Sequence, residues 1–437
     1  MAIGIVRVMA FDVIKQRYPG PVAIRSYKWC VVALLWVVCF FNYADRQAIF
    51  SVFPVLHSDL GLSDVQLGVA GASFMWMYAL FGPLAGWLGD RLSRKGLILG
   101  ALIFWSCMTA ATALAHNYWQ LTACRALGGL GEAFYFPASM SLIGDYHGAR
   151  TRSRAMALHQ SSVYGGTIGG SVISGWIAQY HGWRPMFGCF GLAGIVWAVV
   201  LWGLLREPGR GLAEEARPAQ PRAPGTLRDV LANRLVVLLI LAFIGANFVA
   251  MVFLTWMPSY LYRTFSMSLT MAGWTATAYL QMASVTGVLC GGVAADWLSR
   301  RRPGGRTATQ SAGLLCGVPF LFLTGWTLSV PVLVTAMACF GYFKGVYDAN
   351  IFASLYDVVQ VEVRATAAGI LNSLGWLGAG FAPVAVAAAS GRFGMSACLS
   401  ATSAIYLGSA ILLAWASRLQ RHPSRSLRIS PRKMRSV

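Results

Sequence analysis

Charged residues are scarce in this sequence. Only 11% of its 437 residues are Asp, Glu, Lys or Arg, whereas soluble domains contain about 25%, and 57% are hydrophobic. Acids are the scarcest, with 15 Asp and Glu against 35 Lys and Arg, which gives a formal net charge of +20. This composition argues against a soluble protein. It predicts an all-α membrane protein, because each bilayer span needs about 20 mostly apolar residues.

Several catalytic and metal-binding patterns are also missing. The nine cysteines form no Cys-x-x-Cys pair and the six histidines are dispersed, so neither a disulfide framework nor a zinc site is expected. No His-Glu-x-x-His, Gly-x-Ser-x-Gly or P-loop motif occurs, which argues against a membrane enzyme, and we expect no cofactor. The basic residues lie in loops and tails between apolar runs, so nucleic-acid binding is not expected either.

The apolar runs fall into two groups of six. We expect a cytoplasmic tail at 1–28, a six-helix half at 29–205, a linker at 206–234, a second six-helix half at 235–416 and a basic tail at 417–437. The first run follows a basic, mixed segment and is a full span, so a cleavable signal peptide is not expected. The predicted spans are 29–56, 67–88, 96–115, 119–143, 157–180, 183–205, 235–261, 271–297, 309–326, 330–356, 365–390 and 395–416.

Basic residues occupy every second loop. Arg91, Arg94 and Lys95 follow the second run, whereas the loop at 57–66 contains two aspartates and neither Lys nor Arg. Because cytoplasmic loops carry the excess of Lys and Arg, both termini and the linker are predicted to be cytoplasmic. We expect a multi-pass protein of a cell membrane, in particular a bacterial inner membrane.

The second half repeats features of the first. Residues 86–95 (GWLGDRLSRK) and 292–301 (GVAADWLSRR) share a glycine, an aspartate and two basic residues at identical spacing. Glu132-Ala133 in the fourth run likewise matches Asp348-Ala349 in the tenth. Twelve spans in two parallel, pseudo-symmetric halves are a known transporter architecture, whose site lies between the halves near the membrane midplane.

These motifs resemble those of a known family. Residues 86–95 resemble the cytoplasmic loop signature of the major facilitator superfamily, and Arg125 to Gly131 (RALGGLG) resembles its fourth-helix pattern. Within the superfamily, residues 42–46 (NYADR), 131–133 (GEA) and 255–261 (TWMPSYL) are similar to two groups: the spinster-like transporters and the anion:cation symporters of hexuronates and similar acids. The resemblance implies alternating access, with helices 1, 4, 7 and 10 lining a central cavity.

Charged residues in the spans point to the site. Asp45 and Arg46 lie well inside the first predicted span, where an ionisable group is costly unless it faces a partner or a polar cavity. Glu132 is the first candidate for the proton site and Asp45 the second. The alternative is a set of buried ion pairs that fix helix register. The candidate substrate-binding residues are Arg46, Arg125, Lys344, Asp348, Tyr347, Asn42, Trp256, Gln281 and Asn372.

Spacing predicts how some of these charges meet. Arg125 and Glu132 are two helical turns apart and share a face, while Lys344 and Asp348 are four residues apart and can pair. The resemblance implies a separate role for the repeated cytoplasmic loops, as a latch that stabilises the outward-facing state. The candidate latch residues are Gly86, Asp90, Arg91, Arg94, Asp296 and Arg300.

The leading functional hypothesis is a secondary transporter that couples protons, or another cation, to a small organic anion. One alternative is a spinster-like carrier of lysolipids or sphingoid bases. Another is a proton-coupled antiporter, although residues 165–172 (GGTIGGSV) lack the proline of the run that such exporters often carry in helix 5. The expected partners are a small-molecule substrate, protons and the lipid bilayer, and we expect a monomer.

Overall fold

The computed structural model describes residues 21–89, 91–148, 151–208, 232–359 and 364–421, and their regular structure is helical. Asp90, most of both tails and most of the linker therefore lie outside the described residues. The first half contains α2 (Pro21–Ser51), α3 (Phe53–Leu60), α4 (Asp64–Gly89), α5 (Arg94–Thr112), α6 (Tyr118–Ala133), α7 (Tyr135–Tyr146), α8 (Arg152–His181) and α9 (Trp183–Leu204). The second contains α11 (Arg234–Phe265), α12 (Leu269–Arg301), α13 (Gly305–Trp326), α14 (Val330–Asp348), α15 (Ile351–Val358), α16 (Arg364–Gly380), α17 (Ala382–Phe393) and α18 (Met395–Arg421).

The all-helical membrane fold is confirmed. Within the described residues, ten helical segments are long and apolar enough to cross a bilayer. The other two predicted spans are also helical. The span at 119–143 is divided into α6 and α7, and α8 has 30 residues, about 45 Å of helix, but a more polar sequence.

Four predicted spans are interrupted. The break between α6 and α7 falls at Phe134, because Pro137 has no N–H to donate to the carbonyl of Ala133 one turn earlier. Pro54 and Pro383 lie at the starts of α3 and α17 in the same way. The break between α14 and α15 contains no proline, and the side chain of Asn350 donates instead to the carbonyl of Val346. The breaks after α6 and α14 follow the two matched acid–alanine pairs of the repeat.

The chain forms two compact units. Unit 1 contains Met1–Pro221, Leu254–Thr277 and Pro383–Ala388, and unit 2 contains Arg222–Phe253, Ala278–Ala382 and Ala389–Val437. The predicted first half thus lies within unit 1. Unit 1 also includes the end of α11, the start of α12 and residues Pro383–Ala388 of α17, so the residues of these three helices are divided between the units.

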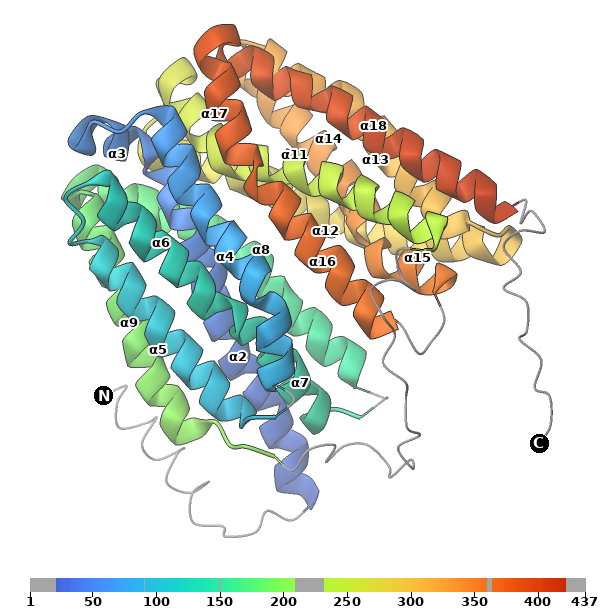
Figure 1. Cartoon of the computed structure of the whole chain (residues 1–437), viewed down its shortest axis with the longest axis horizontal. Coiled ribbons are helices and arrows are strands. Elements are labelled where there is room, and N and C mark those ends of the chain that lie inside the picture. The colour runs from blue at the N-terminus through green and yellow to red at the C-terminus, as the bar shows by residue number, and fades with distance from the viewer. Residues whose placement is uncertain (1–20, 90, 149–150, 209–231, 360–363, 422–437) are drawn as a thin grey trace. The chain divides into compact units, whose positions relative to one another are not determined.

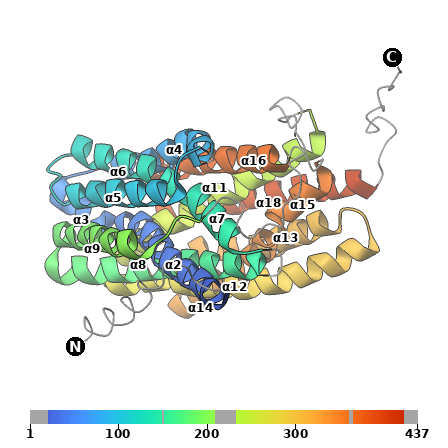
Figure 2. The same cartoon turned by 90° about the horizontal axis from the view of Figure 1, so that it is seen from below.

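Glycines allow the closest helix contacts within unit 1. Its helices pack in the pairs α2 with α8, α4 with α6, and α5 with both α6 and α9 (Figures 1 and 2). A Cβ on Gly170 would lie 2.4 Å from the Cα of Ala44, and one on Gly129 would lie 2.2 Å from the carbonyl oxygen of Phe74. These contacts bring α2 and α6, which carry the charged residues, close to their neighbours.

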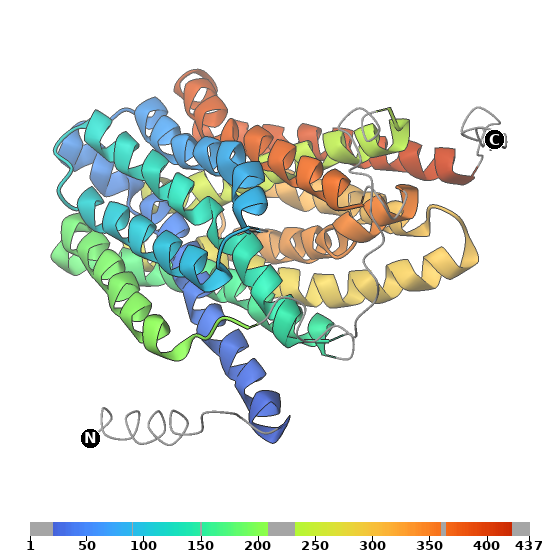
Figure 3. The same cartoon turned by 60° about the horizontal axis from the view of Figure 1, so that its bottom comes forward.

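Glycine also allows a close helix contact in unit 2. α13 packs against both α14 and α18. The turn that leads from α12 into α13 is drawn in yellow at the right of Figure 3. A Cβ on Gly341 of α14 would lie 2.3 Å from the carbonyl oxygen of Leu280 in α12. Gly129 makes the corresponding contact between α6 and α4 in unit 1, so the sequence repeat is accompanied by similar packing in each unit.

The neighbouring glycines Gly128 and Gly129 provide a test of this packing. We expect Gly129→Ala to lower the melting temperature of the detergent-purified protein by several degrees, because its methyl group would meet the backbone of Phe74 and overpacking costs about 1–3 kcal/mol. Gly128→Ala is the matched control, since a Cβ there has no atom within 4 Å. Equal melting temperatures for the two variants would contradict this assignment.

Candidate functional site: a buried cluster of charges

Four charged side chains meet inside unit 1. Asp45 and Arg46 come from α2, and Arg125 and Glu132 from α6. All are almost fully buried, with exposed fractions of 4%, 6%, 2% and 1%. Because they sit within apolar helices, ionised forms are tolerated only when opposite charges are close.

The ion pairs cross between the two helices. Arg46 Nη2 lies 2.9 Å from Glu132 Oε2, and Arg125 Nη1 lies 3.7 Å from Asp45 Oδ1. Neither the adjacent Asp45 and Arg46 nor the pair Arg125 and Glu132 forms the close contact. The reason is helical geometry: adjacent residues point about 100° apart, and residues seven apart are separated by about 10.5 Å along the axis.

Polar and aromatic groups surround the cluster. The Asn42 side-chain oxygen accepts a hydrogen bond from Arg46 at 3.3 Å, and the Thr109 hydroxyl of α5 donates to Asp45 Oδ2. The Arg46 guanidinium also lies over aromatic rings, where cation–π attraction stabilises it. These rings belong to Tyr43, Phe74 and Tyr78, with centroid distances of 4.7, 4.9 and 4.9 Å.

The cluster keeps unused hydrogen-bonding capacity. Glu132 Oε1 and Asn42 Nδ2 are buried and have no hydrogen-bond partner among the described residues. A buried polar atom without a partner is costly, so such atoms are candidates for binding a proton, a water molecule or a ligand. Thr109 was missed by the sequence analysis, because one threonine in an apolar run looks like any other.

A second pair lies in unit 2. The Lys344 ammonium contacts the Asp348 carboxylate on α14, as their spacing predicts. Their side chains are 19% and 25% exposed, so they are more accessible than the cluster in unit 1. Tyr347 is buried, at 3% exposure, and its backbone carbonyl accepts a hydrogen bond from Gln310 at 3.4 Å.

The other predicted substrate-binding residues are scattered. Trp256 belongs to unit 1, where its Nε1 donates to the carbonyl of Pro383 at 3.1 Å and its ring packs 5.4 Å from that of Phe53. Gln281 of α12 is buried and Asn372 of α16 is partly exposed, and both belong to unit 2. The indole N–H of Trp256 is thus occupied by helix packing.

One end of unit 1 is joined by polar contacts. Arg263 near the end of α11 makes a bidentate ion pair with Asp64 at the start of α4, with N···O distances of 2.8 and 2.9 Å. The Gln47 amide donates to the carbonyl of Leu254 at 2.9 Å. Loop charge predicts that this end is extracellular. The nearby Asp59 carboxylate accepts hydrogen bonds from Trp183 and Arg184, and both keep its pKa below the usual range.

Three predicted latch residues of the first half, Gly86, Arg91 and Arg94, lie at the opposite end of the unit, and Asp90 lies outside the described residues. Arg94, at the start of α5, forms an ion pair with Asp145 near the end of α7. Its backbone N–H and that of Lys95 donate to Glu207 at 2.9 and 2.6 Å. Arg91 lies over the Trp87 ring with a centroid distance of 3.9 Å, and Gly86 is partly exposed.

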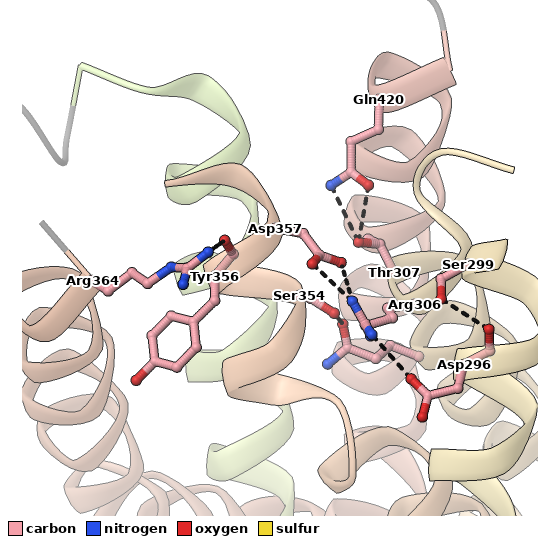
Figure 4. A network of polar contacts seen from close by, with 10 residues as sticks. Asp296, Ser299, Arg306, Thr307, Ser354, Tyr356, Asp357, Arg364 and Gln420 are labelled. Carbon is pink, nitrogen blue, oxygen red and sulfur yellow. Dashed lines mark hydrogen bonds and ion pairs between the residues drawn. The ribbon is translucent and has the colours of Figure 1, made fainter. Parts of the chain in front are cut away.

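The repeated loop in unit 2 has a related network, shown in Figure 4. Arg306 of α13 contacts Asp296 of α12 at 3.0 Å and Asp357 of α15 at 2.8 Å, while the predicted Arg300 is exposed. A cavity of about 570 Å³ lies beside this network. Asp145, Arg306 and Asp357 were not selected from the sequence. The sequence feature that could have identified Asp145 and Asp357 is their position just after the fourth and tenth predicted spans.

A multi-pass helical protein that buries ion pairs within its spans has the features of a secondary transporter. The sequence model of the Major Facilitator Superfamily matches residues 35–383. The chain therefore belongs to this superfamily, whose members are membrane transporters rather than enzymes.

Curated relatives include transporters of sugar acids. The "Probable galactarate/D-glucarate transporter GudP" of Bacillus subtilis is 28% identical over 387 residues, covering 80% of this chain and 83% of the relative. The "Hexuronate transporter" of the same species is 26% identical, over 79% of this chain and 83% of the relative. Human "Protein spinster homolog 1" is 30% identical, over 67% of this chain and 59% of the relative.

Solved structures share the fold. The inward-facing, unoccupied structure of a bacterial homolog to the human lysosomal transporter Spinster has a TM-score of 0.81 and 22% identity, over 90% of this chain and 98% of the other. The D-xylose-proton symporter has a TM-score of 0.73 and 16% identity, over 89% and 97%.

The crossed pairing can be tested by a double-mutant cycle. Arg46→Gln or Glu132→Gln alone leaves a buried charge without its partner, which costs several kcal/mol and should lower the melting temperature strongly. The double variant should recover part of this loss. The control is Arg125→Gln with Glu132→Gln, whose members do not form the close contact. A larger recovery in the control would show that Arg125, not Arg46, is the partner of Glu132.

Proposed function

We propose that this protein is a secondary transporter that moves a sugar-acid anion together with protons across a bacterial inner membrane by alternating access. The observation that carries the proposal is the crossed pairing of two buried carboxylates with two buried arginines. The relatives named as galactarate/D-glucarate and hexuronate transporters support an organic anion as substrate.

The pairing suggests how proton and anion binding are linked. Glu132 is the first proton site and Asp45 the second, and Arg46 and Arg125 receive the substrate carboxylate. When an anion binds Arg46, Glu132 loses its counter-charge in a low-dielectric site. A bare buried carboxylate is unfavourable, so the group takes a proton instead. Because binding of the anion favours protonation of Glu132, anion and proton binding are coupled. Each anion that enters is then accompanied by a proton.

The remaining residues supply recognition and conformational control. In unit 1 we assign Asn42 and Trp256 to substrate binding, with Arg46 and Arg125. In unit 2 the proposed substrate-binding residues are Lys344, Tyr347, Asp348, Gln281 and Asn372. On the cytoplasmic side, the proposed latch residues are Arg94 with the neighbouring Gly86, Asp90 and Arg91 in unit 1, and Arg306 with Asp296 and Arg300 in unit 2. Both termini lie in the cytoplasm and the transporter works as a monomer.

A spinster-like lipid carrier is the second candidate. It is supported by the relative "Protein spinster homolog 1", at 30% identity. The aromatic rings around Arg46 suit an amphipathic molecule as well as a sugar acid. In that case Arg46 and Arg125 would bind a charged headgroup.

Glu132→Gln tests the coupling. A glutamine cannot cycle through a proton, so uptake of galactarate into proteoliposomes driven by a pH gradient should be abolished. Counterflow exchange, which needs no net proton movement, should persist. Uphill uptake at the wild-type rate would rule out Glu132 as the coupling site.

A ligand screen tests the substrate class. A ligand at 100 times its dissociation constant stabilises the protein by about 2.7 kcal/mol, which a thermal-stability assay detects. We expect galactarate, glucarate or a hexuronate to raise the melting temperature, more strongly at acid pH because the proton binds with the anion. Stabilisation by lysolipids or sphingoid bases alone would favour the lipid carrier.

A further inference from the structure

The Thr109 hydroxyl is shared by two acceptors inside unit 1. Its oxygen lies within hydrogen-bonding distance of Asp45 Oδ2 and 3.0 Å from the backbone carbonyl oxygen of Trp105. A hydroxyl has one hydrogen and can donate to only one of them at a time, but it can accept a second hydrogen bond. Thr109 is 3% exposed, so its hydroxyl is shielded from bulk solvent.

We propose that Thr109 is a positioning residue that senses and tunes the protonation of Asp45. With Asp45 ionised, the hydroxyl donates to Oδ2. When Oδ2 takes a proton, the hydroxyl hydrogen turns to the Trp105 carbonyl, and the new carboxylic O–H donates to the Thr109 oxygen. Both protonation states of Asp45 are therefore hydrogen-bonded, without a change in helix position. This inference rests on the proposed role of Asp45 in proton coupling.

Few charged groups act on Asp45, and Thr109 contacts it by a hydrogen bond. Arg125 and Glu132 of α6 and Arg46 of its own helix are the charged groups that act on Asp45. Gly166, Gly169 and Gly170 of α8 pack on residues 40–44 of α2, and the segment 166–171 (GTIGGS) that contains them has no ionisable group. Acidic and basic groups of the other helices packed on α2 have partners elsewhere: Asp59 of α3 with Arg184, His57 of α3 with Asp64, and Asp145 of α7 with Arg94. The Tyr135 hydroxyl of α7 contacts the Leu35 carbonyl and His159, and the Tyr146 hydroxyl donates to the carbonyl of Arg206.

The effect of losing the hydroxyl has a definite sign. A hydrogen bond to a carboxylate is about twice as strong as one between neutral groups, so the hydroxyl stabilises ionised Asp45 more than protonated Asp45. Thr109→Val keeps the shape of the side chain but removes the hydroxyl. Asp45 should then hold its proton to higher pH, with the midpoint of its titration raised by about one pH unit.

Infrared titration of the purified full-length protein measures this directly. The band of a protonated carboxyl group that disappears in Asp45→Asn belongs to Asp45, and its intensity is followed against pH. We expect a raised midpoint in Thr109→Val and the wild-type midpoint in Thr109→Ser, which restores the hydroxyl. Thr112→Val is the matched control, because Thr112 is also buried in α5 and its hydroxyl donates to the carbonyl of Met108 at 2.9 Å.

The outcomes separate this inference from the proposed function. An unchanged midpoint in Thr109→Val, or an equal shift in Thr112→Val, would overturn the role of Thr109. So would the absence of any titrating band assignable to Asp45. Galactarate uptake by the wild-type protein that ignores the pH gradient would instead overturn the proposed symport. The infrared result does not depend on transport, so each failure can be recognised.

Discussion

The rest of this structure depends on the need to compensate charge in an apolar interior. Asp45 and Glu132 are ionisable groups in the spans of a membrane protein, and each lies beside an arginine of the other helix. Because either charge alone would be strongly unfavourable there, the relative register of α2 and α6 is tied to the two ion pairs. An outside charge that bound one member of the cluster would leave that member's partner uncompensated.

Helix packing places this cluster. Gly129 allows α6 to lie against the backbone of Phe74, and Gly170 allows α8 to lie against Ala44, next to Asp45. These contacts leave no room for a side chain, and they bring the ring of Phe74 over both Arg46 and Arg125. Small residues thus determine where the charged ones meet, which is how helices associate in a medium as apolar as their own side chains.

The polar contacts at the ends of the helices differ from those at the centre. Arg94 with Asp145, and Arg306 with Asp296 and Asp357, join neighbouring helices near the predicted cytoplasmic surface. Arg263 and Asp64 do so at the other end of unit 1. Their side chains are more exposed on average than the central cluster. The exposed pairs among them, such as Arg306 with Asp296, are individually weak, so they can break and re-form at little cost.

The class of fold and the candidate charged residues can be predicted from the amino-acid sequence alone. Apolar runs and alternating loop charge predict a helical membrane protein of about twelve spans, and the resemblance of residues 86–95 and 125–131 to family motifs indicates the major facilitator superfamily. Asp45, Arg46, Arg125 and Glu132 stood out because charges are rare in such runs. The Lys344–Asp348 contact followed from its spacing within a single helix, since residues four apart meet on one face.

The pairing of the charges and the groups that surround them become visible only when the helices are packed together. The contacts of Arg46 with Glu132, and of Thr109 with Asp45, join residues 86 and 64 positions apart. Periodicity places a side chain on a face of its own helix, but not against a particular residue of another helix. That choice depends on helix register and on close approaches at Gly129 and Gly170. The division of α11, α12 and α17 between the two units could not be predicted for the same reason, because contacts between helices are not encoded in local sequence patterns.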